Sequence, residues 1–251
     1  MVGTIYLDER TMGLLTSGIK SMRVTILQPS YLPWLGFFEQ MHRSDQFVLY
    51  DDVQFTRRDW RNRNRIRVQE GSVWLTVPVI QKNKYEQSLI ETKIDNSTSW
   101  KRKHLESIRC HYSKTPFFDL YFPWCEKTFN REWNFLLDLS LETIQYLKGE
   151  LKINTPLLRS SELGESGNKS ERLISICKQL GATQYLSGES AKNYISEKDF
   201  SDQGIGLEYQ NYQHPEYPQR YEGFVPFLST IDLLFNCGDK SMGFLKQTNC
   251  A

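Results

Sequence analysis

The stretch "RVTILQPSYLPWLGFFEQMHRSDQFVLYDDVQF", residues 23–55, decides the fold class. Residues 23–27 and 46–50 are short runs rich in β-branched and aromatic side chains, which predict buried strands. Between them, Trp34, Phe37, Phe38 and Met41 recur at the spacing of a buried helix face. A strand, a helix and a strand within about 30 residues form a βαβ unit, which implies a parallel sheet. The sequence therefore predicts an α/β fold with a Rossmann-like parallel sheet core.

The remaining chain adds elements to this core. Residues 62–79 predict two strands joined by a turn at Gly71, and residues 96–112 and 124–148 predict helices with an aromatic connection between them. Residues 169–180 predict a further helix, residues 183–188 a strand, and residues 189–195 the start of another helix. We expect one domain over residues 22–246, with a helical subregion at 96–150, an N-terminal extension at 1–21 and a tail at 247–251.

Composition excludes several classes of protein. With 251 residues, 39% hydrophobic content and a formal net charge of +1, the chain can bury a core but gives no global support for nucleic-acid binding. No apolar run approaches the roughly 20 residues of a membrane span, and the first 20 residues lack the hydrophobic segment of a signal peptide. The five scattered cysteines show no paired metal-ligand spacing. We therefore expect a cytoplasmic protein with reduced thiols, no metal site and no nucleic-acid partner.

Polar residues follow the first two predicted strands. Ligands of parallel sheets bind beyond the carboxyl ends of the strands, so these residues are expected to converge on one site. The candidates are Gln28, Tyr31, Asp51, Asp52 and Gln54. Alternatively, the two aspartates are ordinary turn or cap residues and the aromatic side chain belongs to the core. Two adjacent carboxylates could hold a metal with a phosphorylated substrate, but two residues are a weak metal signal.

An arginine ladder marks the first strand of residues 62–79. Arg61, Arg63, Arg65 and Arg67 alternate, so an extended chain places all four on one face. Four guanidinium groups on one face repel one another unless an anion or acidic residues lie opposite, and arginine suits phosphate or carboxylate ligands. Arg63, Asn64 and Arg65 are therefore candidate ligand contacts; the alternative is a solvated edge strand with protective charge.

A third candidate site lies at "YLSGESAKNYI", residues 185–195. A strand, a tight turn and a helix start present free backbone amides to an anion. Ser187, Gly188 and Lys192 are the candidate contributors, and an ordinary connection between a strand and a helix is the alternative reading. Neither the GxxxxGK[ST] nor the GxGxxG nucleotide fingerprint is present.

His214 is the candidate catalytic base. Pro215 and Pro218 restrict the backbone around it, which suits a side chain that must be held in one geometry. A loop histidine with an ordinary hydrogen bond is the alternative. Tyr217 and Gln219 follow in the same stretch, and we include them among the candidate substrate contacts.

The next predicted helix supports this assignment. Ser229, Asp232 and Asn236 lie at i, i+3 and i+7, forming a polar stripe on an otherwise apolar helix. A buried polar stripe needs partners, which His214 or Gln219 could supply, and in the first case Asp232 would orient the imidazole. Cys237 beside the stripe is either a nucleophile or, as is more common, a small packing residue.

Several segments occur in a fixed order along residues 24–239: "QPSYLPWLGFF", "FVLYDDVQF", "WRNRNRIR", "WLTVPV", "YLSG", and "HPEYPQ" followed by "FLSTIDLLFNCG". With these segments the chain resembles the WbqC-like protein family, bacterial proteins commonly encoded with surface-polysaccharide genes. The resemblance implies modification of activated sugars, as in O-antigen synthesis, or of carrier-bound acyl or aminoacyl groups.

The layout of residues 26–55 is also similar to the opening of pantothenate synthetases and related nucleotidylyl transferases. Gly36 stands at the glycine of their HxGH motif, and Gln54 with Phe55 matches a Gln-Phe pair of that family. Trp34 and Phe37 replace both histidines, and no KMSKS-like lysine loop is present. The similarity thus implies a shared fold and puts adenylyl transfer in doubt.

Three hypotheses follow. The first is an acyl or aminoacyl transferase acting on an amine in glycan or specialised-metabolite synthesis, with His214 as base and a small-molecule or carrier-protein partner. It needs no resident cofactor, and its substrate is phosphopantetheine-linked or nucleotide-linked. The second is an ATP-using nucleotidylyl transferase or ligase, and the third is a non-catalytic binding subunit of a biosynthetic complex.

Overall fold

The structure, a computed structural model, describes residues 21–57, 59–81, 86–164, 167, 169–193 and 195–247. The expected N-terminal extension, apart from Ser21, and the expected tail, apart from Gln247, lie outside the described residues. Among the described residues, no helix has the length and apolar character needed to cross a membrane.

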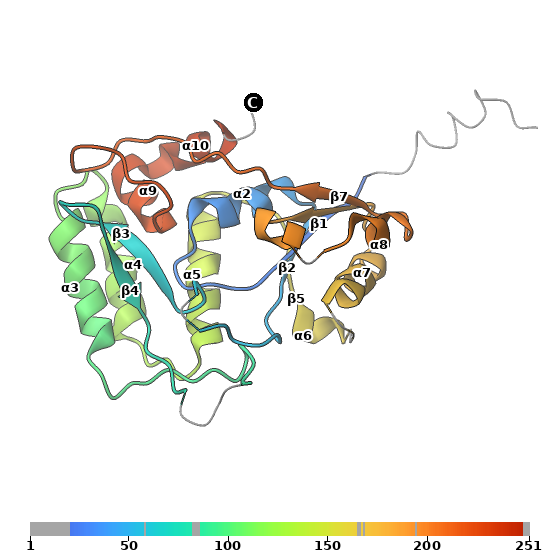
Figure 1. Ribbon diagram of the computed structural model, residues 1–251. Helices are drawn as coiled ribbons and strands as arrows, with labels where there is room; N and C mark the ends of the chain where they lie inside the picture. The colour runs from blue at the N-terminus through green and yellow to red at the C-terminus, as the bar shows by residue number, and fades with distance from the viewer. Residues whose placement is uncertain are drawn as a thin grey trace, which may run out of the picture.

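A five-stranded parallel sheet forms the centre of the fold (Figure 1). Its strands are β1 (Arg23–Leu27), β2 (Gln46–Leu49), β5 (Leu157–Arg159), β6 (Gln184–Ser187) and β7 (Gly206–Tyr209), in the spatial order β5-β2-β1-β6-β7. All neighbouring strands in it are parallel. The prediction of an α/β fold with a Rossmann-like parallel core is confirmed.

Both faces of the sheet are covered, which explains why apolar residues of both parities in β1 and β2 are buried. Val24, Ile26 and Val48 pack into one buried cluster with α7 (Lys169–Gln179) and α8 (Glu197–Ser201). Phe47 and Leu49, of opposite parity, pack into a larger cluster with α2 (Leu35–Arg43). Alternation along β1 and β2 thus supplies residues to two separate cores.

The chain between β2 and β5 forms the helical end of the molecule (Figure 1). It contains the antiparallel hairpin of β3 (Arg63–Arg67) and β4 (Ser72–Thr76), then α3 (Trp100–Tyr112), α4 (Phe118–Asn130) and α5 (Leu136–Glu150). The hairpin turn contains Gly71 at φ 83°, a conformation that favours glycine. The predicted hairpin is therefore present.

The predicted aromatic connection at residues 113–124 is wrong in its second half. Residues 118–124 belong to α4, which contains Pro123 in its interior. An interior proline usually breaks a helix, but here the ring of Phe118 stacks at 6.0 Å from that of Phe235, and Tyr121 lies edge-on to the same ring. Tertiary packing therefore overrides the local signal. The predicted helix at 124–148 is instead divided between α4 and α5.

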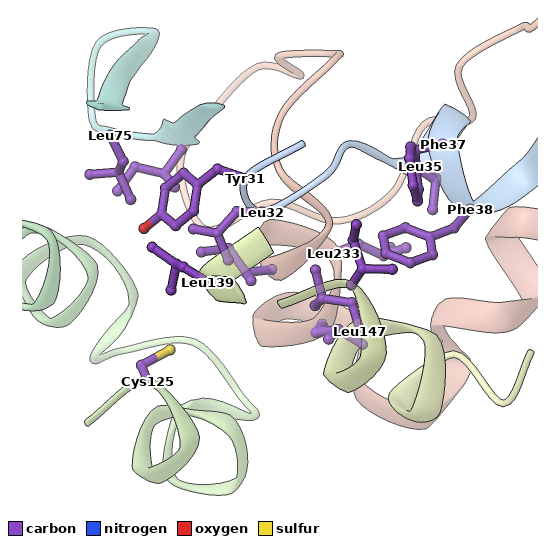
Figure 2. Close-up of a cluster of buried hydrophobic side chains, with 14 of the residues drawn as sticks. Tyr31, Leu32, Leu35, Phe37, Phe38, Leu75, Cys125, Leu139, Leu147 and Leu233 are labelled. Atoms are coloured by element: carbon purple, nitrogen blue, oxygen red, sulfur yellow. The ribbon is translucent and has the colours of Figure 1, made fainter. Parts of the chain in front are cut away.

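Short helices complete the described chain. They are α6 (Ser160–Leu163), the 3-10 helix η1 (Glu189–Asn193), α9 (Thr230–Cys237), the 3-10 helix η2 (Gly238–Lys240) and α10 (Ser241–Gln247). After β7 the chain returns to the helical end, where α9 is buried along its whole length. The large cluster at this junction joins residues from α2, α5 and α9, among them Phe38, Leu147 and Leu233 (Figure 2).

The strand order places a crevice between β1 and β6. From β1 the chain builds outward first to β2 and β5, and then returns to build β6 and β7 on the other side. The loops that leave β1 and β6 therefore run in opposite directions. In open α/β sheets this reversal is the position where ligands bind.

Candidate functional site

A cavity of about 470 Å³ lies at this reversal. Its walls come from the carboxyl end of β1, the first turns of α2, and the segments that follow β6 and β7. Five aromatic side chains contribute to its lining: Trp34, Phe37, Trp60, Tyr212 and Phe227. The lining also contains the polar residues Gln40, Arg65, Glu189, Ser190 and Gln210. A cavity that combines apolar and polar groups is the usual form of a small-molecule site.

Trp34 builds one wall and explains the glycine that follows it. The indole lies so close to Gly36 that a Cβ atom there would be 2.3 Å from the ring. Trp34 pairs with Ser229 in an isolated β-bridge, and its ring contacts Tyr212 and Phe227 at centroid distances of 4.9 and 5.7 Å. Gly36 therefore lets the indole lie across the start of α2, where it joins the site to α9.

A chain of amide hydrogen bonds forms the polar side of the cavity. The Nε2 of Gln210 donates to the carbonyl of Gly36 at 2.7 Å and to Glu39 Oε2 at 2.6 Å. Because a carbonyl can only accept, the nitrogen of Gln210 is fixed on this side and its oxygen faces Gln40. Gln40 Nε2 donates to that oxygen at 2.5 Å. The orientation of both amides is thus determined by the network.

The remaining oxygen of this network faces no donor. Gln40 is 3% exposed and lines the cavity, yet its Oε1 has no hydrogen-bond partner among the described residues. An unsatisfied buried acceptor costs on the order of 1–3 kcal/mol. The hydroxyl of Tyr212, in the same lining, also has no partner within the described part of the chain.

Glu39 fixes the network to its surroundings. Its Oε1 accepts a bond of 3.0 Å from Arg43 Nη1, and Arg43 also pairs with Glu208 of β7. Burial raises the pKa of Glu39, against the lowering effects of Gln210 and Arg43. The network therefore ties α2 to the edge strand of the sheet.

Arg65 is the cationic group of the cavity lining. Its Nη2 donates to the Phe227 carbonyl at 3.4 Å, a long bond, and its Nε has no partner among the described residues. The guanidinium lies 5.6 Å from the ring centroids of both Trp60 and Trp74. Stacking on indoles holds a guanidinium in place while leaving its N–H groups available for an anion.

The other arginines of the predicted ladder have different partners. Arg61 donates to the Gln28 carbonyl at 3.0 Å and pairs with Asp59, whereas Arg63 stacks on Trp74 at 4.3 Å. Arg67 is 3% exposed and donates four hydrogen bonds to backbone carbonyls, namely those of Val68, Gly71, Glu222 and Gly223. The four arginines of the ladder thus have separate roles. Arg65 is the member of the ladder that lines the cavity.

His214 lies directly behind the aromatic wall. Its ring contacts those of Tyr212 and Phe227 at centroid distances of 5.6 and 5.2 Å. Its Nδ1 bonds the Pro215 carbonyl at 2.9 Å, which requires a proton on Nδ1 and leaves the lone pair on Nε2. Nε2 is buried and has no partner among the described residues. Burial lowers the pKa of His214, against a smaller raising effect of the Pro215 carbonyl, so the ring is neutral at pH 7.

The expected hydrogen bond between His214 and Asp232 is not formed. His214 bonds the Pro215 carbonyl, and Asp232 has separate partners. The carboxylate of Asp232, which is 0% exposed, accepts hydrogen bonds from Tyr112 at 2.7 Å, Tyr217 at 2.9 Å and Gln219 at 3.0 Å. Burial raises the pKa of Asp232 to about 6, against the lowering effects of these bonds and of Arg67. Asp232 reaches the imidazole through Tyr217, whose ring lies 6.1 Å from that of His214.

The other polar residues of α9 serve the helix itself. Ser229 caps its start by accepting from the Ile231 amide, and Asn236 donates to the Asp232 carbonyl at 2.7 Å. Cys237 is 5% exposed, and burial raises the pKa of its thiol to about 11, with a further contribution from Asp232. A thiol with that pKa is overwhelmingly protonated at neutral pH and is a poor nucleophile.

Asp51 and Asp52 form a closed cluster at the ends of β2 and β5. Asp51 accepts bonds from Arg159, Ser160 and Ser161, while Asp52 accepts from Ser160 and Arg172. Burial favours a raised pKa for Asp51, but the bonds from Ser161 and Arg159 outweigh it and hold that pKa below its ordinary value. The two carboxylates thus serve as caps and ion-pair partners.

The remaining predicted residues lie around the cavity or in the core. Gly188 lines the cavity. Ser187 is buried at the end of β6, where its carbonyl accepts a hydrogen bond from the backbone N–H of Gln210. Tyr31 is 0% exposed, bonds His104 Nδ1 at 2.9 Å and belongs to the large apolar cluster (Figure 2).

Three further predicted contacts do not line the cavity and instead pair with other parts of the protein. The Asn64 amide donates to the Leu32 carbonyl at 2.6 Å. Gln54 pairs with Ser88 in an isolated bridge, and Lys192 pairs with Glu189 at 2.7 Å. Within the described residues, no group of three or more His, Cys, Asp or Glu is arranged to hold a metal ion.

Gln40, Gln210, Tyr212 and Phe227 line the cavity without having been singled out from the sequence. Gln40 offered a faint signal, because it lies with Glu39 between the buried residues Phe38 and Met41 on a short helix. Its partner Gln210 is 170 residues away along the chain, so no local pattern connects the two.

Comparison with known proteins gives two matches. The model of the WbqC-like protein family matches residues 28–243. The chain is also 36% identical over 226 residues to the uncharacterized protein Rv1507c of Mycobacterium tuberculosis, an alignment that covers 89% of this chain and 97% of that protein. No solved structure matches the chain.

Proposed function

The chain belongs to the WbqC-like protein family, and from the cavity at its sheet edge we propose that it is an enzyme transferring an acyl or aminoacyl group to an amine. The reaction would belong to surface-glycan or specialised-metabolite synthesis. One observation carries the proposal: the imidazole of His214 is neutral, has a buried Nε2 lone pair without a partner among the described residues, and contacts the cavity wall.

The proposed step uses this lone pair as a general base. The amine nitrogen of the acceptor attacks the carbonyl carbon of an activated acyl group, and a C–N bond forms. Nε2 of His214 takes the proton that the nitrogen loses, and the tetrahedral intermediate expels a thiolate or phosphate, which can take up that proton on leaving. A histidine held neutral at pH 7 suits this role, because a protonated ring could not accept the proton.

Phe227 governs access to the imidazole in this proposal. It lines the cavity, contacts the His214 ring and is 42% exposed. Its φ of 58° is unusual for a residue other than glycine. Rotation of its side chain brings the base and the cavity into one space, and Arg65 on the same wall then holds an anionic group of the substrate.

Asp232 acts indirectly as a positioning residue. It holds the hydroxyl of Tyr217 and the amide of Gln219, and the Tyr217 ring packs against the imidazole. Cys237 has no role in the proposed step, because a protonated buried thiol is a poor nucleophile. The reaction is therefore direct transfer without a covalent enzyme intermediate.

The test uses a deletion strain of the host organism and profiles its glycans and small metabolites by mass spectrometry. Wild-type protein should restore an amide-bearing product, whereas His214→Phe, which keeps a ring in the aromatic cluster, should leave the unmodified amine. His111→Phe is the matched control, since His111 also contacts a tyrosine ring but lies away from the cavity. Full product formation by a folded His214→Phe variant would exclude the base and favour a non-catalytic binding subunit.

The ATP-using alternative has its own measurement. A search for pyrophosphate release by the purified protein in the presence of ATP, magnesium and the acceptor distinguishes it from direct acyl transfer, whereas ATP binding alone does not. Pyrophosphate formed in proportion to the amide product would replace the proposed step by nucleotidylyl transfer or ligation.

A further inference from the structure

The unpaired amide edge of Gln40 specifies what the cavity binds. Gln40 Oε1 is an acceptor without a partner among the described residues, and Nε2 carries two protons of which one goes to Gln210. The edge therefore offers one acceptor and one donor to a ligand. The bonds of Gln210 to Gly36 and Glu39 prevent the amide from reversing these roles.

The space beside this edge is kept clear by a glycine. A Cβ atom on Gly188 would lie 3.5 Å from Gln40 Nε2, which is ordinary contact distance. An alanine would fit there, but a branched side chain would cover the amide. Gly188 thus leaves room beside the Gln40 amide, whose Oε1 is itself buried, and the rings of Trp34 and Tyr212 provide flat apolar surfaces in the same lining.

Arg65 adds a second requirement. It lines the same cavity, and its guanidinium stacks on indoles with one long bond to Phe227 and an Nε that has no partner in the described part of the chain. A ligand that satisfies both groups is flat at one end, with a hydrogen-bond donor beside an acceptor, and anionic at the other. A linear trans amide carries its donor and acceptor on opposite sides, whereas a nucleobase presents them side by side.

We propose that the cavity binds a nucleoside phosphate, with the base edge on Gln40 and the phosphate on Arg65. This inference rests on the proposed function only in taking the cavity as the substrate site. It narrows the substrate to a nucleotide-linked compound and makes Gln40 the residue that recognises the base.

The test is titration calorimetry of the full-length protein with four probes: UMP, AMP, ribose 5-phosphate and 4′-phosphopantetheine. At least one nucleotide should bind tenfold or more tightly than ribose 5-phosphate and 4′-phosphopantetheine. A difference between UMP and AMP identifies the base. Nucleotides that bind no better than ribose 5-phosphate would overturn the proposal, and so would preferred binding of 4′-phosphopantetheine.

Variants assign the recognition to Gln40. Gln40→Met keeps the side-chain length and should weaken nucleotide binding at least tenfold while leaving ribose 5-phosphate unchanged. Gln46→Met is the control, because the Gln46 amide bonds the Pro156 carbonyl away from the cavity. If Gln40→Met unfolds, Gly188→Val should block the nucleotide while Gly188→Ala binds it. Unchanged nucleotide affinity in folded Gln40→Met or Gly188→Val would refute the assignment.

The His214→Phe variant separates this inference from the proposed function. It should bind the nucleotide with wild-type affinity, because the imidazole lies behind the cavity wall. Binding that depends on Gln40, with no amide product lost from the deletion strain, would remove the proposed reaction and leave the nucleotide site standing. Loss of the amide product in His214→Phe, with no nucleotide binding by the wild-type protein, would remove the nucleotide site and leave the proposed reaction standing.

Discussion

Asp232 and Gln40 are both buried polar side chains on short helices, yet their surroundings differ in one respect. Asp232 accepts three hydrogen bonds from Tyr112, Tyr217 and Gln219. Gln40 donates to Gln210 and keeps an oxygen that meets no donor among the described residues. A closed network holds a fold together, whereas an open one at a cavity leaves an acceptor for a water molecule or a ligand.

The same contrast appears between two arginines of one strand. Arg65 and Arg67 alternate on β3, so both side chains leave the same face of the strand. Arg67 is buried and donates four bonds to carbonyls, including those of Glu222 and Gly223 in the loop before α9. Within the described part of the chain, the Arg65 side chain makes one long bond, and it lies at the cavity. The two residues are of the same type and leave the same face of the strand. Only their tertiary contacts distinguish the structural role of Arg67 from the position of Arg65 at the cavity.

The largest expected effect is the loss of the closed network. Asp232→Ala leaves the hydroxyls of Tyr112 and Tyr217 without an acceptor and removes one bond of the Gln219 amide, which also donates to the Val225 carbonyl. At on the order of 1–3 kcal/mol for each unpaired buried group, the free energy of unfolding should fall by about 3–5 kcal/mol. Urea unfolding measures this, with Gln40→Met as the comparison variant, for which a smaller loss of about 1 kcal/mol is expected, because the variant removes the unpaired Oε1 together with the one bond to Gln210. Equal losses would remove the distinction between the two networks.

Local sequence patterns predicted three strands of the sheet, β1, β2 and β6, because these strands carry their own signals; β5 lies in a segment that reads as a polar loop, and neither β5 nor β7 was predicted. The β1–α2–β2 unit followed from apolar runs and helical spacing, and the hairpin from the turn at Gly71. The first half of α4 was missed because its stability comes from ring packing on Phe235, which outweighs the local effect of Pro123. Contacts between distant segments are invisible to a local pattern.

The candidate site was predictable to a smaller extent. Arg65 and Gly188 were expected from strand alternation and from a strand-to-helix turn, and both line the cavity. Gln40 was not expected, because a single glutamine in an amphipathic helix has no distinctive spacing. Its role depends on Gln210 and Gly188, which reach it only when β6 and β7 add to the sheet.

The second prediction uses pH to isolate the closed network. Burial raises the pKa of Asp232 to about 6, above its ordinary value of 3.8. The folded state therefore holds this proton more tightly than the unfolded chain, so the contribution of Asp232 to stability is full below about pH 4 and decreases as the pH rises to about 6. At about 1.4 kcal/mol per unit, the decrease approaches 3 kcal/mol.

Asp232→Asn removes this titration. The stability of wild type relative to the variant should therefore fall between pH 4 and pH 6, as measured by urea unfolding at each pH. Groups such as Asp51, whose pKa is lowered, contribute the opposite slope, but they cancel in the difference between the two proteins. A constant difference over this range would show that Asp232 does not titrate there.

The third prediction concerns the two arginines. Arg67→Met removes four donors to partly buried backbone carbonyls and should lower the free energy of unfolding by about 2 kcal/mol. Arg65→Met should change it by no more than about 0.5 kcal/mol, because the side chain makes one long bond. The order should reverse for UMP or AMP binding, with a loss of about tenfold in Arg65→Met and little change in Arg67→Met. The comparison uses four samples: wild type at two protein concentrations, Arg65→Met and Arg67→Met. Each is measured by calorimetry and by urea unfolding.

The smallest expected effect is that of Cys237, which adjoins the closed network and lies outside the cavity lining. Cys237→Ala removes one buried sulfur and should cost about 1 kcal/mol of stability. Because burial raises the pKa of the thiol to about 11, almost none is ionised at pH 7, and a thiol-specific reagent should modify it much more slowly than the exposed Cys110. The variant should still form the amide product in the deletion strain. Loss of that product by folded Cys237→Ala would restore the thiol as nucleophile, and the closed region would then belong to the active site.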